Sequence, residues 1–259
     1  MRLDKYLSDM GVATRSESKK IIKAGRITVD GEVIADPAFH VSNTHSVSFD
    51  GTPLSYREHI YYMLNKPQGV ITATKDNSKK TILDLINQGD RIRELFPVGR
   101  LDKDTEGLLL ITDDGALAHE LLSPKKHVDK TYRAIVTGEV TQEDIVSFAK
   151  GLEIDGGEIC LPALLIVEST TPLKHLSAEY RKKFPPKSEG TLALDDTLSF
   201  IRITIREGKY HQIKRMCKRC GHEVLYLKRL TMGPLTLDES LPLGAYRPLT
   251  SEEVSDLKS

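Results

Sequence analysis

The sequence is poor in the features that mark secreted and membrane proteins. It has 3 cysteines and no tryptophan in 259 residues, and an odd number of cysteines in a chain of this length does not form a disulfide framework. The longest apolar runs, residues 108–111 and 163–167, are far shorter than the roughly 20 residues of a membrane span. Residues 1–5 are charged, unlike a signal peptide. We therefore expect a cytoplasmic protein with no membrane partner.

The chain also has no net charge. Lys and Arg together number 37, as do Asp and Glu, which argues weakly against a nucleic-acid-binding protein because such proteins usually have a basic surplus. The charges are unevenly spread, however. Residues 1–30 contain 7 basic and 4 acidic side chains, and residues 206–229 contain 8 Lys or Arg and 2 Glu. Local basic clusters of this kind can bind RNA phosphates whatever the total charge.

The most informative stretch is residues 98–115. An acidic loop with glycines precedes the apolar run 108–111, which is too short for a typical helix and is bounded by turn residues. We therefore predict a buried strand there. Because a loop fixed onto a rigid strand often carries functional side chains, Asp102, between Arg100-Leu101 and Lys103, is the candidate catalytic carboxylate.

Two other interpretations of this loop stay open at this point. Its aspartates can cap backbone N–H groups in an ordinary turn. The loop also matches the opening of an EF-hand calcium site, whose ligands would be Asp102, Asp104, Glu106 and Asp113. An EF-hand needs a helix on either side, whereas Pro97 and Gly99 precede this loop and a strand is predicted after it. The calcium interpretation is therefore the weakest of the three.

Residues 1–52 are predicted to form a small module of two helices and short strands. Thr14 and Glu17 make a capping box at the start of the second helix, and Asp30-Gly31 is a type I′ turn signal between two strands. A basic helix face is usually only solvated, but a cluster of this size also suits RNA phosphates. The candidate contacts are Arg2, Lys5, Arg15, Lys19, Lys20, Lys23 and Arg26.

After a polar linker at residues 53–59, residues 60–259 are predicted to form a larger α+β domain with a mostly antiparallel sheet. Strands are plentiful and are not regularly separated by long helices, which disfavours a doubly wound sheet. Tyr132 lies in one of these strands and is, by spacing alone, a half-buried packing residue. Residues 173–196 are rich in Lys, Pro, Ser and Gly, so we expect an exposed insertion that is partly disordered.

The most basic window of the chain follows a strand at residues 200–205. Aromatic side chains interleave its cations, as in a strip that faces RNA, and the candidate contacts are Lys209, Tyr210, His211 and Arg215. Cys217 and Cys220 form a lone CxxC pattern, which is a weak metal signal. On a helix both cysteines share a face with Ile213, so we predict core packing rather than a metal site.

Five segments together resemble one family. Gly-Arg-Leu-Asp-Lys-Asp-Thr-Glu-Gly-Leu-Leu-Leu at residues 99–110 resembles the second motif of pseudouridine synthases of the RsuA/RluB branch. Lys-Pro at residues 66–67, Lys-Thr-Tyr at 130–132 and Gly-Lys-Tyr-His-Gln-Ile-Lys at 208–214 are similar to further motifs of that family. Residues 2–31 resemble the S4 RNA-binding module. The resemblance covers nearly the whole chain except the predicted insertion.

The resemblance implies a role for each matching residue. Asp102 would be the catalytic residue, and Tyr132 would stack on the target base and be placed to move a proton. Lys214 would pair with Asp102, and this cation favours an ionised carboxylate. Arg100 would fill the gap left by a flipped nucleotide, and Ile213 would line the pocket.

For the whole protein, the resemblance implies conversion of a uridine in ribosomal RNA to pseudouridine, with the nucleotide flipped into a pocket and with neither cofactor nor metal. It is strongest to the small-subunit enzymes, which implies 16S rRNA or a small-subunit assembly intermediate and a target of the uridine-516 type. Lys66 would support the active-site loop within the RNA site. The alternatives are a large-subunit (23S) enzyme of the same branch and a non-catalytic rRNA- or ribosome-binding protein.

Overall fold

The computed structural model describes residues 1–42, 44–54, 58–91, 93–177 and 192–259. They divide into two compact units, one formed by Met1–Ile60 with Ile86–Leu95 and the other by Tyr61–Leu85 with Phe96–Ser259. The predicted linker, residues 53–59, lies partly outside the described residues. Residues 86–95 join the first unit because contacts such as that from Arg93 Nε to the Asp9 carbonyl (3.0 Å) hold them there. The domain limits expected from the sequence stay a prediction.

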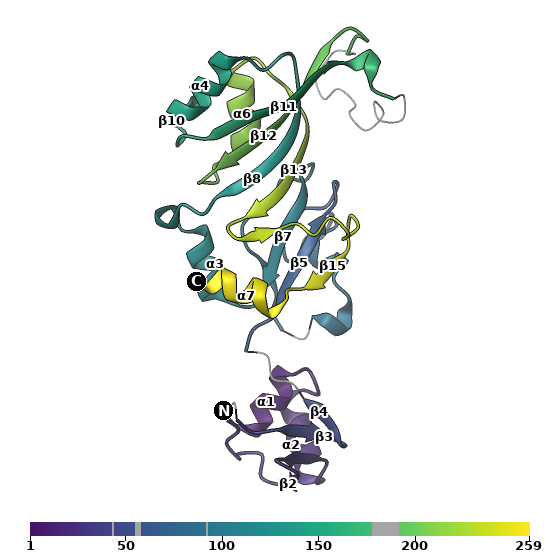
Figure 1. The fold of residues 1–259 in the computed structure, drawn as a ribbon. Coiled ribbons are helices and arrows are strands. Elements are labelled where there is room, and N and C mark those ends of the chain that lie inside the picture. Colours follow the sequence, from purple (N-terminus) through teal and green to yellow (C-terminus); the bar gives the residue numbers. More distant parts are fainter. Residues whose placement is uncertain (43, 55–57, 92, 178–191) are drawn as a thin grey trace. The chain divides into compact units, whose positions relative to one another are not determined.

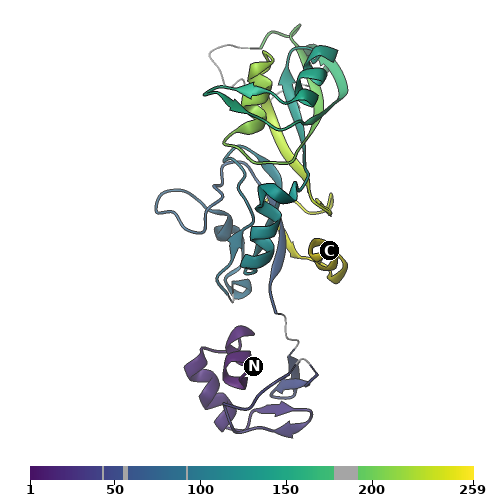
Figure 2. The ribbon, with the colours of Figure 1, turned by 90° about the vertical axis from the view of Figure 1, so that its left-hand side faces the viewer.

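The first unit packs two helices onto a four-stranded sheet of order β2-β1-β3-β4 (Figure 2). Thr14 and Glu17 form the predicted capping box, and Asp30 and Gly31 have φ angles of 51° and 87°, as a type I′ turn requires. Leu3, Tyr6, Leu7 and Ile22 of the helices pack against Ile27, Val29 and Val47 of the strands. The elements are α1 (Leu3–Asp9), α2 (Arg15–Lys23), β1 (Ile27–Val29), β2 (Glu32–Val33), β3 (Val47–Phe49) and β4 (Thr52–Leu54).

The second unit is built on a nine-stranded sheet whose main order is β11-β12-β8-β13-β7-β5-β15 (Figure 1), with β14 beside β13 and β6 beside β7. Among the described strands, only β7 and β13 pair in parallel, so the predicted α+β class with a mostly antiparallel sheet is confirmed. The strands are β5 (Tyr61–Lys66), β6 (Phe96–Pro97), β7 (Glu106–Thr112), β8 (Lys130–Thr137), β11 (Leu164–Pro172), β12 (Thr197–Ile205), β13 (Val224–Met232), β14 (Leu235–Thr236) and β15 (Tyr246–Pro248).

Helices lie against this sheet at both ends. Leu117 and Leu121 of α3 (Gly115–Leu122) and Leu257 of α7 (Ser251–Lys258) pack against buried residues of β5 and β7. At the other end of the sheet (Figure 1), α4 (Gln142–Lys150) contacts β11 and α6 (Gln212–Arg219) contacts β13. The sequence analysis did not predict α4, although its capping box begins at Thr141. No described helix is both long enough and apolar enough to cross a membrane.

The parallel contact between β7 and β13 depends on a glycine. Gly107 pairs with Arg229 in the ladder and has a φ of 102°. A Cβ at this position would lie 2.2 Å from the Arg229 carbonyl oxygen. Only glycine allows both this conformation and this close approach. The contact sets the strand β7, which carries the Asp102 loop at its start, directly beside β13.

The predicted insertion at residues 173–196 is partly different from expectation. Residues 178–191 lie outside the described residues, and the pairing of β11 with β12 continues as far as Pro172 and Thr197. Leu173 is buried rather than exposed, and its N–H donates to the Asp196 carbonyl at 2.8 Å. The segment is therefore the connection of a long β-hairpin, and its apolar first residue packs into the core because the adjoining strands place it there.

Candidate active site

A cleft of about 880 Å³ opens in the second unit. The Asp102 loop forms one wall, residues of β8 and β13 form another, and the segment from Ile205 to Lys214 forms a third. These segments are far apart in the sequence and meet because β8 pairs with both β12 and β13, and β13 pairs with β7. The predicted site residues that line the cleft are Arg100, Asp102, Tyr132, Lys209, Tyr210, His211, Ile213 and Lys214.

Hydrogen bonds from Lys66 hold the Asp102 loop in place. The Lys66 ammonium donates to the carbonyl oxygens of Asp102 (3.0 Å), Lys103 (3.4 Å) and Thr105 (2.9 Å). Thr72 adds a second attachment, since its hydroxyl donates to the Leu101 carbonyl at 2.7 Å. Backbone carbonyls that converge on one cation fix the path of a loop, so the carboxylate of Asp102 projects from a rigid support.

Lys66 was grouped with the RNA contacts, but the structure places it elsewhere. Its side chain is 0% exposed, so it cannot meet a phosphate at the surface. Burial lowers its pKa to about 8, although the nearby carboxylates of Asp104 and Asp102 act in the opposite direction. The role that its motif suggested, support of the loop, is the one that its geometry allows.

The Asp102 carboxylate lies beside Lys214, at the first turn of α6. Lys214 Nζ is 3.0 Å from Asp102 Oδ2 and 2.5 Å from Asp104 Oδ1. Burial alone would lower the pKa of Lys214, but the hydrogen bonds to Asp104 and Asp102 outweigh it and raise that pKa. The ammonium therefore stays charged between two carboxylates and fixes the orientation of Asp102.

On its other side, Asp102 faces His211, whose Nε2 lies 3.5 Å from Asp102 Oδ1. His211 has a φ of 49° and directly precedes α6. Tyr210 stacks on the His211 ring, with the ring centroids 3.8 Å apart and the planes at 18°. Because Tyr210 is 73% exposed, this pair offers a flat aromatic surface at the rim of the cleft, suited to contact with RNA bases.

Tyr132 and Ile213 form apolar parts of the cleft. Both are buried, at 7% and 4% exposure, and both border the open space. Arg100 also lines the cleft and is exposed. The arrangement thus combines a carboxylate, a neighbouring ammonium, a buried phenol ring and an exposed guanidinium, which suits acid–base or nucleophilic chemistry on a planar base.

Arg215 was also grouped with the RNA contacts, but it does not line this cleft. It pairs with Asp155 and with Glu158 on the hairpin of β9 (Glu153–Ile154) and β10 (Glu158–Ile159). Helical geometry explains the difference, since adjacent residues of α6 point about 100° apart. Lys209, in contrast, lines the cleft and lies 3.5 Å from Glu207.

In the first unit, all seven candidate cations are exposed. Arg2 is tied to Asp4 and Arg26 to Asp50. The remaining members include the α2 residues Lys19, Lys20 and Lys23, for which the described part of the chain provides no ion pair.

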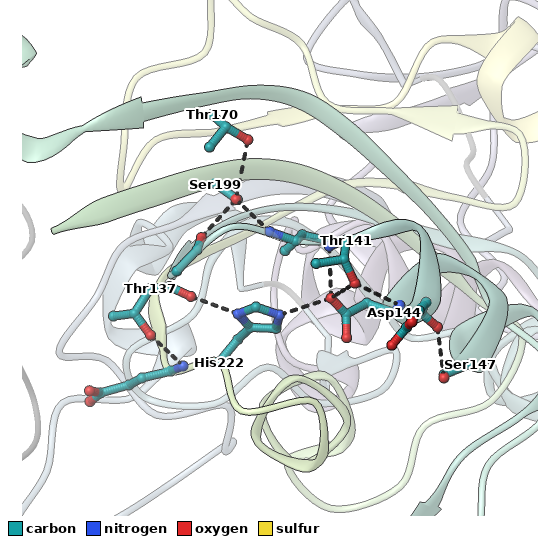
Figure 3. Close-up of polar contacts among 11 residues, drawn as sticks. Thr137, Thr141, Asp144, Ser147, Thr170, Ser199 and His222 are labelled. Atoms are coloured by element: carbon teal, nitrogen blue, oxygen red, sulfur yellow. Dashed lines mark hydrogen bonds and ion pairs between the residues drawn. The ribbon is translucent and has the colours of Figure 1, made fainter.

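The CxxC segment lies apart from the cleft. Cys217 is buried in α6, and burial raises the pKa of its thiol. The neighbouring His222 has both ring nitrogens engaged, by the Thr137 carbonyl at 2.7 Å and by Asp144 Oδ2 at 3.3 Å (Figure 3). Within the described ranges, no group of three His, Cys, Asp or Glu residues is arranged to hold a metal ion.

The loop also lacks the context of a calcium site. Glu106 belongs to β7 rather than to a helix, and it accepts a hydrogen bond from the Tyr226 hydroxyl at 2.8 Å. Asp102 and Asp104 already share the Lys214 ammonium. The EF-hand interpretation is therefore wrong.

Comparison with known proteins matches both units. The model of the RNA pseudouridylate synthase family matches residues 60–219, and that of the S4 domain matches residues 1–46. The chain belongs to the RNA pseudouridylate synthase family. As a pseudouridine synthase it is an isomerase that acts on RNA, and the family that the sequence motifs suggested is confirmed.

Relatives of this pseudouridine synthase align over its full length. YtzG of Bacillus subtilis, described as an uncharacterized RNA pseudouridine synthase, is 44% identical and covers 98% of this chain and 97% of its own. Ribosomal small subunit pseudouridine synthase A of Escherichia coli K12 is 36% identical and covers 99% of this chain and 100% of its own. A crystal structure of a pseudouridylate synthase is 33% identical, has a TM-score of 0.62, and covers 99% of each chain.

Sequence reasoning missed several parts of this pseudouridine synthase's site. Asp104 shares Lys214 with Asp102, and Thr72 holds the loop. Lys130 and Arg229 line the cleft from β8 and β13. The strand that carries Lys130 was expected, whereas the strand that carries Arg229 was not. An alternating pattern does not show which face of a strand borders a cleft, so no local signal identified either residue.

Proposed function

We propose that this protein converts a uridine of ribosomal RNA to pseudouridine, with Asp102 as the catalytic carboxylate. The observation that carries the proposal is the position of Asp102: its Oδ2 lies 3.0 Å from Lys214 Nζ, in a cleft that Tyr132 also lines. An ionised carboxylate fixed by a cation can act as a nucleophile or accept a proton.

The reaction needs no co-substrate. The bond between C1′ and N1 breaks, the base turns, a bond from C1′ to C5 forms, C5 loses its proton and N1 gains one. Because the product is an isomer of the substrate, no oxidant, reductant or phosphate donor enters the balance. Asp102 would act at the sugar or the base, Tyr132 would stack on the uracil and assist proton movement, and Lys214 would hold Asp102 ionised.

Access to the base requires that the nucleotide leave its stack. Arg100, exposed at the rim, would occupy the space that the flipped nucleotide vacates. Tyr210 and His211 would stack against neighbouring bases, and Lys209 would approach a phosphate. The exposed lysines of the first unit would contact phosphates without regard to sequence.

The substrate we favour is 16S rRNA or a small-subunit assembly intermediate in the cytoplasm, with a target of the uridine-516 type. Full-length relatives at 36% and 38% identity are named ribosomal small subunit pseudouridine synthase A, which supports this choice over a large-subunit target. The S4 domain match adds support for binding of structured RNA.

Pseudouridine mapping in rRNA tests the proposal. A strain that lacks the protein should lose one pseudouridine of 16S rRNA, and a plasmid with the wild-type chain should restore it. A plasmid with Asp102→Asn, expressed to the same level, should not. Equal modification with both plasmids would contradict a catalytic role for Asp102, and loss of a site in 23S rRNA instead would contradict the choice of substrate. No lost site at all would favour a non-catalytic RNA-binding protein.

A further inference from the structure

Arg229 lies at the floor of the cleft and has no assigned role. It is 2% exposed, yet it borders the open space. On β13 it pairs in register with Tyr132 of β8, and directly opposed residues of antiparallel strands project from the same face of a sheet. Arg229 is therefore the cross-strand neighbour of the tyrosine expected to stack on the base.

The hydrogen bonding of Arg229 is incomplete. Its Nε donates to the Leu108 carbonyl at 2.7 Å, but its Nη2 has no hydrogen-bond partner among the described residues. The described part of the chain also gives it no carboxylate as an ion-pair partner. A buried cation with an unpaired N–H group lowers the free energy of unfolding. A ligand that supplies a hydrogen-bond acceptor offsets this loss.

A second cation accompanies it. Lys130 is 8% exposed, lines the same cleft, and donates to the Val128 carbonyl at 3.0 Å. Burial and the charge of Arg229 together lower the pKa of Lys130. The nearest acidic neighbour in sequence, Asp129, is occupied by Arg206 at 2.8 Å. Two positive charges thus share the floor of the cleft. This arrangement favours a ligand that carries negative charge or hydrogen-bond acceptors.

The depth of this site decides which part of RNA can reach it. A phosphodiester stays on the backbone at the rim when a nucleotide is flipped, whereas the base enters the pocket. Arginine has only donors, so its partner on the base must be an oxygen. Uracil has two, O2 and O4, on either side of N3.

The following inference rests on the proposed function. We infer that Arg229 donates a hydrogen bond to a carbonyl oxygen of the flipped uracil. With Lys130 beside it, Arg229 also stabilises the negative charge of the detached base. When the C1′–N1 bond breaks with its electron pair on the base, the charge spreads over N1, O2 and O4. The same electrons later form the C5–C1′ bond as the C5 proton leaves. Donors fixed where charge develops lower the barrier of such a step.

The rotation of the uracil ring gives a second reason for an arginine at this position. Rotation of uracil about its N3–C6 axis brings C5 to the place of N1 and exchanges O2 with O4. A fixed donor therefore meets an oxygen both before and after the rotation. In cytosine, one of the two positions carries an amino group, which an N–H donor repels. Arg229 thereby also selects uridine over cytidine.

Thio-substituted RNA tests this contact. The substrates are oligonucleotides with uridine, 2-thiouridine or 4-thiouridine at the mapped target. The single-turnover rate of pseudouridine formation is measured for wild type, Arg229→Lys and Arg229→Met. Sulfur accepts hydrogen bonds more weakly than oxygen, so one thio substitution should slow wild type by roughly tenfold or more. Arg229→Met should be slower with uridine by about 10²- to 10³-fold and should show a much smaller thio effect.

The matched control is Arg133→Met, which removes an exposed arginine next to Tyr132 on β8 that pairs with Glu168. This variant should keep the wild-type rate and the wild-type thio effect. If Arg229→Met does not fold, Arg229→Lys still tests the inference, because a shorter cation should reduce the thio effect. Thio effects of equal size in wild type and the folded Arg229 variants would overturn it.

Two further outcomes are distinguishable. If the Arg229 variants bind RNA more weakly but react at the wild-type rate when saturated, the contact is to a phosphate and the inference is wrong. If wild type forms no pseudouridine at the mapped site in 16S rRNA or in a small-subunit assembly intermediate, the proposed function itself fails, and this inference falls with it.

Discussion

The two units of this protein use basic side chains in opposite ways. In the first unit, Lys19, Lys20 and Lys23 are exposed on α2, with no ion-pair partner in the described residues. In the cleft of the second unit, Lys66 is fully buried under the Asp102 loop, and Lys214 is held between two carboxylates. Exposed cations are available to bind phosphates of many sequences. The cations of the cleft are held by fixed partners within the protein, so they position the catalytic groups instead. The predictions below test this division.

Among the basic residues, the largest effect is expected at Lys214. Lys214→Met should lower the single-turnover rate by about 10²- to 10³-fold, because Asp102 loses the ammonium 3.0 Å from its Oδ2. Lys214→Arg should recover part of the rate, since it restores the charge. RNA affinity should change little in both variants. A rate loss in Lys214→Met that is matched by an equal loss of affinity would place Lys214 with the binding cations instead.

Lys66 gives a pH-dependent test of stability. Its pKa falls from 10.5 to about 8 on folding because of burial. The unfolded chain therefore binds more protons between pH 8 and 10.5, and the contribution of Lys66 to the free energy of unfolding rises with pH over that window, by up to about 3 kcal/mol. Urea unfolding at pH 7.5 and pH 10 measures it. The gap in stability between wild type and Lys66→Met should shift in favour of wild type at the higher pH. An unchanged gap would contradict a Lys66 pKa that is lowered by burial.

The exposed lysines should act on binding alone. Replacement of Lys19, Lys20 and Lys23 by Gln should weaken RNA binding by about tenfold at moderate salt and reduce the slope of log affinity against log salt by about 2 to 3. The single-turnover rate at saturating RNA should stay at the wild-type value. Filter binding over a salt series measures the slope. A lower rate at saturation would show that these lysines also serve the chemistry.

Arg215 provides the smallest expected effect. Since it is engaged by Asp155 and Glu158, Arg215→Gln should leave RNA affinity within about twofold of wild type and the salt slope unchanged. The same assay as for the α2 lysines measures it. A reduced salt slope would restore Arg215 to the set of RNA contacts that the sequence suggested.

The sequence was most informative where a short segment carries its own signal. The strand at β7, the capping box at Thr14 and the turn at Asp30-Gly31 depend on neighbours in the chain, and all three are present. The encounter of Asp102 with Lys214, which are 112 positions apart, was expected only from motif resemblance, because periodicity does not report contacts at that separation.

The features that could not be predicted depend on strand register and on burial. Arg215 was placed among the RNA contacts because basic residues in a basic window are usually exposed, and Lys66 was placed there because its Lys-Pro motif resembles one of the family. The fold instead buries Lys66 under a loop and turns Arg215 toward a hairpin. Arg229 reaches the cleft only because β13 pairs with β8 on one side and, through Gly107, with β7 on the other.

The most direct test of the account is a comparison of wild type and Asp102→Asn on the same 16S rRNA substrate, with the single-turnover rate and the dissociation constant measured together. The account predicts that the variant binds RNA within about threefold of wild type and forms pseudouridine at least about 10⁴-fold more slowly. Pseudouridine formation by Asp102→Asn at a rate near that of wild type would contradict it.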